Sequence, residues 1–308
     1  MPSKSETRQL HSGEYFGESR DSWWDHDFVA FLFKKWQLGH CRYVLDVGCG
    51  VGHWGRVVLP HLPKEAGLVG VDRESEWVKQ ATARAQGAGI GHRARYVSGD
   101  AAKLPFADNE FELVTCQTVL IHVPDCRKVI AEMIRVLKPG GCLLVAEPNN
   151  LAASQIVGNA RFLEPVEQRM VMTRFQLVCE RGKAALGEGN NSAGELVPGL
   201  FSDAGLDNVR VCQSSMAAPL LPPYLTAAEQ ALRGEILDWA GRDFWIWSRD
   251  DTRRYFVAGG GKSEEFEAMW KLAMGLARAD AAALRNNTYS SAGGGVAYLV
   301  VGVKPAAR

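Results

Sequence analysis

A glycine cluster between an apolar run and a helical pattern is the first feature of this sequence that could do chemistry. Gly50, Gly52 and Gly55 have the spacing G-x-G-x-x-G, and Asp72 ends the next apolar run. Glycine lets a backbone approach a ligand closely because it has no Cβ. The free N–H groups at a helix start can then face polar atoms of that ligand. A carboxylate about 20 residues further on can accept hydrogen bonds from ribose hydroxyls, so the turn predicts a ribose-bearing cofactor.

Strands and helices alternate along the chain around this turn. The sequence predicts strands at residues 43–47, 67–72, 94–98, 111–116, 142–146, 206–211 and 296–303. Alternation with helices is typical of an α/β fold with a doubly wound parallel sheet. Such sheets bind ligands at the carboxyl ends of their strands, where Asp46, Asp72 and Asp100 fall. Each aspartate could singly cap a turn or a helix, but their joint placement predicts a binding site.

Charge and hydropathy restrict the partners and the location of the protein. The chain has 308 residues, with 35 basic and 35 acidic side chains and a net charge of zero. This balance argues against a nucleic-acid partner. No apolar run approaches the roughly 18 residues of a membrane span, and residues 1–20 lack the apolar core of a signal peptide. We therefore expect a cytoplasmic protein with no membrane span, either a monomer or a homodimer.

The seven cysteines favour the same location. None of them forms a C-x-x-C pair, and several lie in apolar runs. Buried free thiols in a reducing cytosol explain this pattern. The sequence predicts no metal site.

A series of short motifs follows the glycine turn in a fixed order. They are VLDVGCGVG at 44–52, Asp72, GDA at 99–101, LPF at 104–106, FELV at 111–114, HVPD at 122–125 and VLKPGG at 136–141. With these motifs, residues 42–150 resemble the class I S-adenosylmethionine-dependent methyltransferases, especially the small-molecule branch related to ubiquinone and menaquinone methyltransferases. The resemblance implies a Rossmann-like, seven-stranded, mostly parallel sheet whose last strand is antiparallel and lies between strands 5 and 6.

The resemblance also implies how an S-adenosylmethionine cofactor is held. Asp46 and the backbone of Gly48, Cys49 and Gly50 would face its methionine part. Gln117 and Thr118 would contact the methionine ammonium, because they follow strand 4. Asp72 would bind the ribose hydroxyls, with Arg73 beside the adenine. Asp100 would accept from the adenine amino group, and the N–H of Ala101 would donate to a ring nitrogen.

The motif-bearing core and the segments outside it divide the chain into six parts. They are a lid helix region at 1–40, the cofactor-binding core at 41–150, a helical insertion at 151–205, strand 6 at 206–213, a helical cap insertion at 214–293 and the terminal antiparallel strand at 294–308. With an antiparallel last strand, both insertions leave and re-enter the sheet at its carboxyl end. We therefore expect both insertions above the pocket, where they would build the acceptor site.

The N-terminal region contains three residues that we expect over the cofactor pocket. Tyr15, Arg20 and Trp24 precede strand 1, and lids of this kind exclude water from a bound substrate. Arg20 would pair with the cofactor carboxylate. Trp24 could border the substrate or simply pack a helix that starts near Asp21 or Ser22.

His122 is the best candidate for a general base. It lies in the loop after strand 4, near the expected methyl group. A base is needed only when the acceptor carries a proton at the working pH. A structural or cofactor-contact role for His122 stays open.

Aromatic residues of the second insertion are the best candidates for an acceptor pocket. They are Trp239, Phe244, Trp245, Trp247, Tyr255 and Phe256. Such a cluster could line a pocket for a flat or hydrophobic molecule, or form the core of a helical lobe. We expect some of the residues Arg161, Trp245, Trp247, Tyr255 and Tyr289 to line the pocket.

The sequence therefore predicts a methyltransferase with a helical cap that acts on a small apolar or aromatic metabolite. An NAD-dependent oxidoreductase shares the glycine fingerprint, but the turn at 138–141 and the Asp100 motif argue against it. The other alternative is a non-catalytic cofactor-binding scaffold. A degenerate cofactor site would favour this alternative, but Asp46, Asp72 and Asp100 are all present. RNA methylation is disfavoured by the neutral charge.

Overall fold

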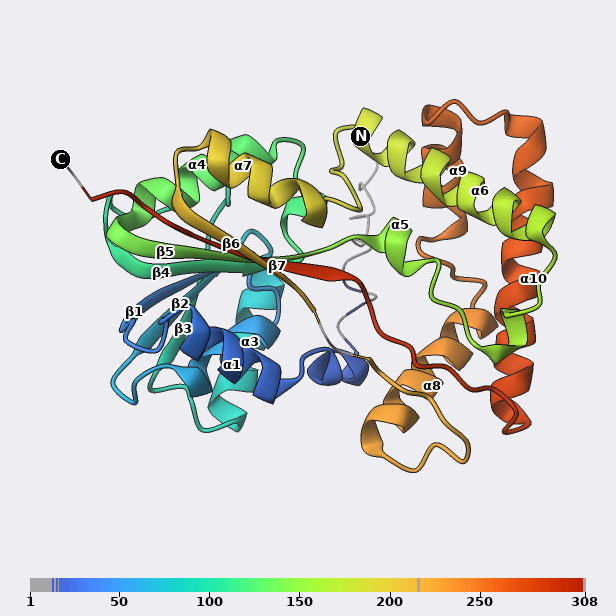
Figure 1. Cartoon of the computed structure of the whole chain (residues 1–308), viewed down its shortest axis with the longest axis horizontal. Helices are drawn as coiled ribbons and strands as arrows, with labels where there is room; N and C mark the ends of the chain where they lie inside the picture. Colours follow the sequence, from blue (N-terminus) through green and yellow to red (C-terminus); the bar gives the residue numbers. More distant parts are fainter. Residues whose placement is uncertain (1–12, 14, 16, 215–216, 307–308) are drawn as a thin grey trace, which may run out of the picture.

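A seven-stranded sheet forms one half of the protein, and a helical cap forms the other (Figure 1). The computed structural model describes residues 13, 15, 17–214 and 217–306. The strands are β1 (Tyr43–Val47), β2 (Gly67–Asp72), β3 (Ala94–Ser98), β4 (Phe111–Gln117), β5 (Leu137–Pro148), β6 (Asp207–Gln213) and β7 (Ala297–Val303). Their order is β3-β2-β1-β4-β5-β7-β6.

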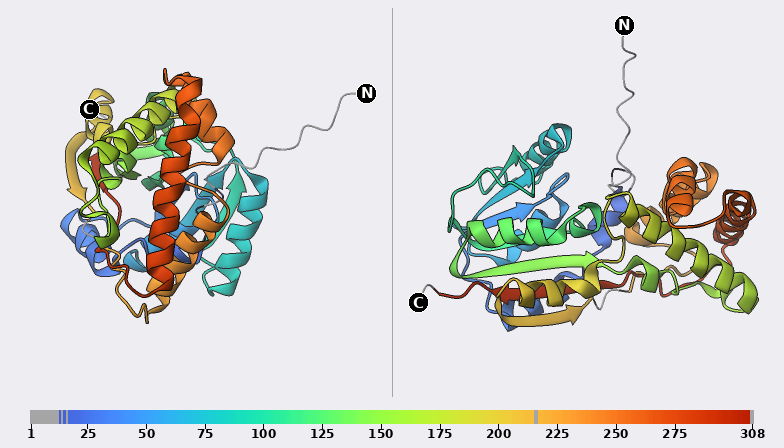
Figure 2. Two further views of the ribbon diagram at one scale, coloured as in Figure 1. Left: turned by 90° about the vertical axis from the view of Figure 1, so that its right-hand side faces the viewer. Right: turned by 90° about the horizontal axis from the view of Figure 1, so that it is seen from above.

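The direction of the last strand confirms the expected topology. Strands β1 to β5 pair in parallel, and β7 pairs antiparallel with both β5 and β6. The carboxyl ends of six strands therefore meet at one edge of the sheet, which faces the cap (Figure 2). Ligands of open α/β sheets bind at this edge.

Helices cover both faces of the sheet, which explains why its central strands are mostly apolar. The helices of the chain are α1 (His26–Lys35), α2 (His53–Val58), α3 (Ser75–Gly87), α4 (Cys126–Val136), α5 (Asn150–Ala153), α6 (Val166–Ala185), α7 (Val197–Asp203), α8 (Ala227–Gly241), α9 (Arg249–Ala258) and α10 (Phe266–Arg285). Helices α1, α2 and α3 cover one face, and α4 and α7 cover the other (Figure 1). In β1, Val44 packs against the first group of helices and Leu45 against the second, as strand alternation requires.

The turn predicted at residues 138–141 lies inside β5. Helix α4 ends at Val136, and β5 begins at the next residue. Its pairing with β4 jumps from Leu137 opposite Phe111 to Cys142 opposite Leu113, so the four residues between bulge out of the ladder. Gly140 has a φ of +77°, which glycine adopts without strain.

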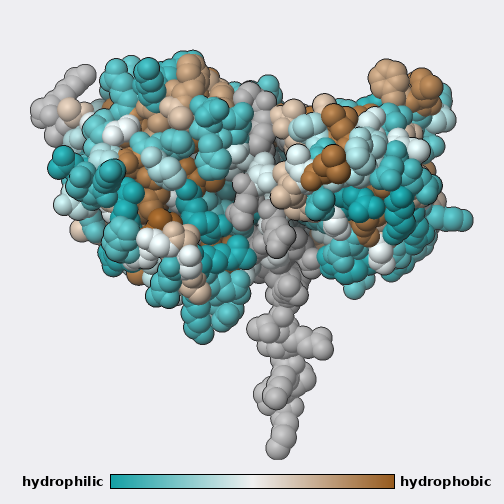
Figure 3. Space-filling model, turned by 90° about the horizontal axis from the view of Figure 1, so that it is seen from below, coloured by the Kyte–Doolittle hydropathy of each residue, from teal (hydrophilic) through white to brown (hydrophobic). Residues whose placement is uncertain are grey.

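The cap contains its own aromatic core. Helices α6, α9 and α10 enclose it, and its large aromatic side chains are Phe175, Trp247, Tyr255, Phe256, Phe266 and Trp270. A smaller cluster joins α8 to α10 through Leu220, Tyr224, Leu284 and Tyr289. The surface of both halves is mostly hydrophilic with scattered hydrophobic patches (Figure 3).

Two expectations about helix positions are wrong. Helix α1 begins at His26, not near residue 21, because the Asp25 side chain accepts from the backbone N–H of Phe28 (3.0 Å) and caps it there. A short 3-10 helix, η2 (Glu18–Ser22), occupies the expected start instead. Helix α7 does not lie above the pocket, because Val197 and Phe201 are buried against the sheet beside α4.

Helices α6 and α9 cross so closely that glycine is required at the crossing. A Cβ on Gly182 of α6 would overlap the carbonyl oxygen of Tyr255. On α10, by contrast, a Cβ at the exposed Gly275 would meet no atom within 4 Å. The two glycines therefore form a matched pair, one packed and one free.

We predict that Gly182→Ala lowers the free energy of unfolding by about 1–2 kcal/mol, because overpacking outweighs the gain in helix propensity. Gly275→Ala should raise it by about 0.5–1 kcal/mol. Urea unfolding followed by circular dichroism measures both. Equal effects of the two substitutions would contradict the close crossing.

Candidate active site

A cavity of about 950 Å³ lies between the carboxyl edge of the sheet and the cap. Its wall on the sheet side consists of the segments that follow β1, β2, β3 and β4. Its opposite wall comes from the segment around α5, from α8, from α10 and from residues 294–297 before β7. Residues from both halves therefore meet around one space.

The glycine turn after β1 forms the floor of this cavity. Gly48, Gly50 and Gly52 have φ values of +64°, +52° and +81°, a region that other residues rarely adopt. A Cβ on Gly48 would also overlap the side chain of Val119. The Cys49 N–H donates to the carbonyl of Val71 (3.0 Å), which ties the turn to β2.

Asp72 connects the end of β2 to the glycine turn. Its Oδ2 accepts from the N–H of Gly50 (2.9 Å), and its Oδ1 accepts from the N–H of Glu74 (3.0 Å). Burial raises the pKa of Asp72, and these two amides oppose the rise. Arg73 points outward, with 62% of its side chain exposed in a pair with Glu74. The carboxylate of Asp72 thus faces the cavity from a fixed position.

Asp100 and Ala101 border the cavity after β3. Asp100 is exposed, and its Oδ1 accepts from the N–H of Ala102 (2.8 Å). Its other carboxylate oxygen is available to a ligand without disturbing this turn.

Asp46 does not border the cavity, in contrast to the role that its motif implied. It is 1% exposed and lies against Gly55 of α2. Alternation along β1 explains this, because the side chain of Asp46 points to the same face as Val44. Burial raises the pKa of Asp46 to about 8; the backbone N–H of Gly55 opposes the rise and Asp72 adds to it.

The loop after β4 carries Gln117, Thr118 and His122, and all three border the cavity. A buried carboxylate positions this loop: Glu147 accepts from the N–H groups of Val119 (2.7 Å) and Leu120 (2.8 Å). A third amide, that of Ile121, lies 3.4 Å from its other oxygen. Glu147 is fully buried, and burial raises its pKa to about 7 although the three amides oppose the rise.

Sequence reasoning missed both Glu147 and a lysine that holds the same loop from the cap. Lys183 of α6 is 1% exposed, and its Nζ donates to the carbonyl of Ile121 (2.6 Å) and to Oδ1 of Asn191 (3.3 Å). Burial lowers the pKa of Lys183 to about 8. A charged residue ending an apolar strand could have marked Glu147, but no local pattern marks Lys183.

The N-terminal segment joins the two halves beside the cavity. Arg20 donates through Nη2 to Oγ1 of Thr118 (2.9 Å) and to Oε1 of Gln117 (3.3 Å). The neighbouring Ser19 donates to Glu235 of α8. The O–H of Tyr15 donates to the carbonyl of Ile246 in the cap (2.8 Å). Tyr15 and Arg20 thus lie at the cavity, as predicted.

Trp24 borders the cavity and also packs the core. It is 8% exposed, and its ring lies 4.9 Å from that of Trp54 in the cluster beneath α1 and α2. Trp24 therefore lies where it could border a substrate, and it also packs against the helices of the core.

The expected acceptor residues divide into two groups. Arg161, Trp245 and Tyr289 border the cavity. Trp247 borders it as well, although it is 0% exposed and packs against Tyr255 inside the cap core (5.3 Å between ring centroids). The O–H of Tyr255 donates to Glu188 (2.6 Å). Tyr255 does not border the cavity, in contrast to the expectation, because it is 1% exposed inside the cap core.

No helix in the described part of the chain is long and apolar enough to cross a membrane. Among the same residues, no three metal-ligating side chains of His, Cys, Asp or Glu gather into a possible metal site.

We predict that Glu147→Gln changes how stability depends on pH. The folded-state pKa of about 7 exceeds the ordinary value of 4.5. The bound proton therefore stabilises the fold fully below pH 4.5, and this contribution is lost as the pH rises to about 7.

The free energy of unfolding of the variant minus that of the wild type should therefore rise across this window. The rise should reach up to about 3 kcal/mol, at roughly 1.4 kcal/mol per pH unit. Urea unfolding at half-unit pH steps measures it. A difference that does not change with pH would contradict the buried, protonated state of Glu147.

Comparisons with known proteins agree on one family. Residues 44–141 match the model of a methyltransferase domain. The chain is similar to the demethylmenaquinone methyltransferase of Listeria welshimeri, with 33% identity over 184 residues that cover 57% of this chain and 74% of the relative. It is also similar to the sterol 24-C-methyltransferase of Aspergillus fumigatus, with 38% identity over 104 residues that cover 34% of this chain and only 27% of that protein.

A solved structure shows the same fold. The YcgJ protein of Bacillus subtilis aligns with 92% of this chain and 100% of its own, at a TM-score of 0.50 and 21% sequence identity. The matched motifs, the sheet order and the Listeria relative together place the chain: it belongs to the class I S-adenosylmethionine-dependent methyltransferases of the small-molecule type.

Proposed function

We propose that this protein transfers a methyl group from S-adenosylmethionine to a small apolar or aromatic metabolite bound under the cap. The observation that carries the proposal is one cavity with two unlike walls. The glycine turn, Asp72 and Asp100 supply the wall on the sheet side, and Trp239, Trp245 and other apolar residues supply the wall on the cap side.

The residues of the sheet wall fit the cofactor of the family. The glycine turn brings the backbone of Gly48, Cys49 and Gly50 to the cavity, where it can approach a ligand closely. Asp72 is rigidly held and can accept from two neighbouring ribose hydroxyls. Asp100 and the N–H of Ala101 offer an acceptor and a donor to the adenine edge, with Arg73 at the rim.

The methionine part would lie between the glycine turn and the loop after β4. Its carboxylate would pair with Arg20, which already reaches Gln117 and Thr118. The backbone of Gly48 to Gly50 would line the same end. Asp46 acts from beneath the turn, through the helix that follows it, and does not contact the cofactor in this assignment.

Orientation and exclusion of water are the main contributions of the chain to catalysis. The cofactor supplies an electrophilic methyl group on a sulfonium, and the acceptor must approach that group in line. Holding two reactants in such a geometry can account for about 7–11 kcal/mol of the barrier in favourable cases. The cap, together with Tyr15 and Arg20 of the N-terminal segment, encloses the reactants.

His122 is the group that we propose as general base for an acceptor that carries a proton. It borders the cavity on the loop that Glu147 and Lys183 hold. A base of this kind contributes roughly 10²- to 10⁴-fold to a rate. An acceptor that is already deprotonated would not need it.

The size and lining of the cavity favour a small acceptor. A volume of about 950 Å³ lies at the upper end of the roughly 300–1,000 Å³ of pockets for one small molecule, so it can hold the cofactor and a second molecule. Trp239, Trp245 and Ile246 give its cap side an apolar, aromatic character. The two relatives described above are named for demethylmenaquinone and for a sterol.

We place the reaction in the cytoplasm, with the protein as a monomer or a homodimer. All seven cysteines are free thiols, and five of them are buried, which suits a reducing compartment. The zero net charge supports a small molecule rather than nucleic acid as the substrate.

We predict that isothermal titration calorimetry detects binding of S-adenosylhomocysteine but not of NAD. Asp72→Asn and Arg20→Gln should each weaken this binding about 10- to 150-fold, because each removes a charge-assisted hydrogen bond worth about 1.5–3 kcal/mol. Arg127→Gln is the matched control, because Arg127 pairs with Asp203 (2.9 Å) and is not one of the residues that border the cavity. Unchanged affinity in both test variants would contradict the assigned cofactor position.

We predict that a screen of small apolar and aromatic metabolites with isotopically labelled S-adenosylmethionine finds a product heavier by one CH₂ group. With that acceptor, His122→Asn should lower kcat at least 100-fold and remove one limb of the pH–rate profile. Mass spectrometry and initial rates measure the two effects. A variant whose kcat and pH profile match the wild type would show that His122 is not the base.

A further inference from the structure

An ion pair stands in the cap wall of the cavity, where the rest of the lining is largely apolar. Arg161 ends the short 3-10 helix η5 (Asn159–Arg161), and Asp280 lies in α10. Arg161 donates through Nη2 to Oδ2 of Asp280. Both residues border the cavity, together with Tyr289. The pair therefore brings two opposite charges to the space that the proposed acceptor occupies.

Each partner of this pair has one buried polar atom with no hydrogen-bond partner among the described residues. These atoms are Nε of Arg161, a donor, and Oδ1 of Asp280, an acceptor. Asp280 is only 8% exposed, so Oδ1 has no access to bulk water. Buried polar groups are nearly always paired in folded proteins. One donor and one acceptor of the same ion pair therefore have no hydrogen-bond partner among the described residues.

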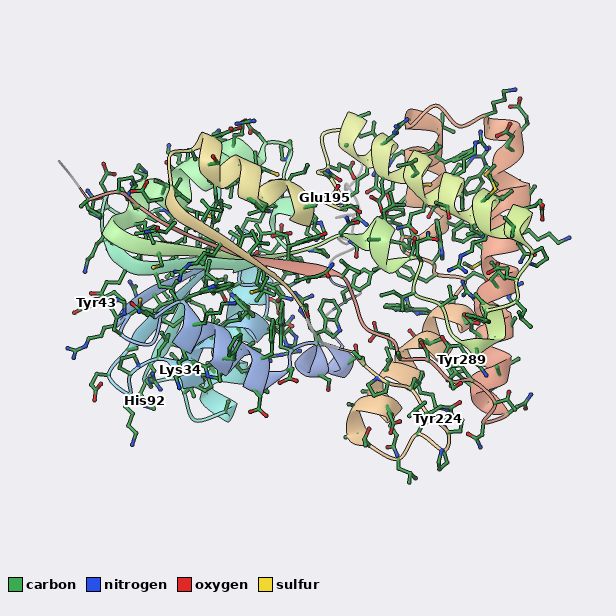
Figure 4. The ribbon with its side chains drawn as sticks, in the orientation of Figure 1. Lys34, Tyr43, His92, Glu195, Tyr224 and Tyr289 are labelled. Atoms are coloured by element: carbon green, nitrogen blue, oxygen red, sulfur yellow. The ribbon has the colours of Figure 1, made fainter. Side chains whose placement is uncertain are left out.

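The position of the pair is well defined by its neighbours. The Tyr289 ring fills the space beside Gly158, where a Cβ would overlap it. Tyr224 donates its O–H to the carbonyl of Tyr289 (2.8 Å), and the two tyrosines lie together in the lower part of the cap (Figure 4). The Arg161 side chain is 30% exposed, so its guanidinium can turn toward a ligand while Asp280 stays fixed.

The combination of donor and acceptor selects the chemistry of a ligand. A carboxylate would meet the charge of Asp280, and an ammonium would meet the charge of Arg161. An apolar group would leave both atoms unpaired. A hydroxyl or a carboxamide can accept from Nε and donate to Oδ1 at once. Sites built to bind such a group discriminate strongly against analogues that lack it.

We propose that the methyl acceptor has an apolar, aromatic body and an uncharged hydrogen-bonding group, a hydroxyl or a carboxamide, that binds Arg161 and Asp280. This inference rests on the proposed function and names the class of its substrate. Arg161 and Asp280 determine specificity and take no part in the methyl transfer.

Four biphenyls that differ in one substituent test the inference. They are 4-phenylphenol, 4-phenylbenzoate, 4-phenylbenzylamine and 4-methylbiphenyl, titrated by calorimetry into the full chain saturated with S-adenosylhomocysteine. The wild type should bind the phenol at least tenfold more tightly than the other three. Equal affinities, a preference for a charged compound, or binding of none of the four would overturn the proposal.

Single substitutions should change the preference in opposite directions. Asp280→Asn removes the negative charge, so the benzoate should gain at least tenfold relative to the phenol. Arg161→Gln removes the positive charge, so the benzylamine should gain by a similar factor. Arg278→Gln is the control, because Arg278 lies two residues away on α10 and pairs with Asp243 on the surface (2.5 Å). It should keep the wild-type order.

A purely structural ion pair gives a different result. Both substitutions would then lower affinity for all four compounds alike, without a change in their order, and this outcome would overturn the proposal. Binding of S-adenosylhomocysteine is measured in every variant. If the wild-type protein does not bind S-adenosylhomocysteine, the proposed function itself is contradicted. If every variant binds S-adenosylhomocysteine but the order of the four ligands does not change, only the role of Arg161 and Asp280 is contradicted.

Discussion

The buried carboxylate of Glu147 is the interaction on which the arrangement of the site depends. It accepts from two consecutive amides of the loop after β4, at 2.7 Å and 2.8 Å, and a third amide lies 3.4 Å away. Three buried N–H groups would otherwise lack partners, at about 1–3 kcal/mol each. Lys183 holds the same loop from the cap through the carbonyl of Ile121. One short loop is thus tied to both halves of the protein, and it carries His122.

Hydrogen bonds and ring contacts of the N-terminal segment connect the two sides of the cavity. Arg20 reaches Gln117 and Thr118 on the sheet side, while its neighbour Ser19 reaches Glu235 in α8. Tyr15 adds one hydrogen bond to the cap. Polar contacts of this kind are lost at little cost when water replaces them. Through these contacts, the N-terminal segment connects the sheet side of the cavity to the cap.

Aromatic residues of the cap line the cavity, form the core of the cap, or do both, and their positions in the sequence do not show which. Trp245 and Trp247 both border the cavity, and Trp247 is also fully buried in the cap core. Tyr255 is buried as well, because its O–H finds a partner in Glu188. The cap needs these large side chains for its own stability, since it packs helices α6, α9 and α10 away from the sheet. Only the remaining aromatic surface is available to an acceptor.

Local patterns in the sequence determined the class of fold, the sheet topology through its ordered motifs, and the positions of the glycine turn, Asp72 and Asp100. These features depend on residues close together in the chain, where strand alternation and turn chemistry act. The orientation of Asp46, the burial of Trp247 and Tyr255, and the pairing of Arg161 with Asp280 depended on the tertiary structure. Arg161 and Asp280 are 119 residues apart, and no local pattern specifies a contact across that distance. Packing of the cap against the sheet decided which charges and rings face the cavity.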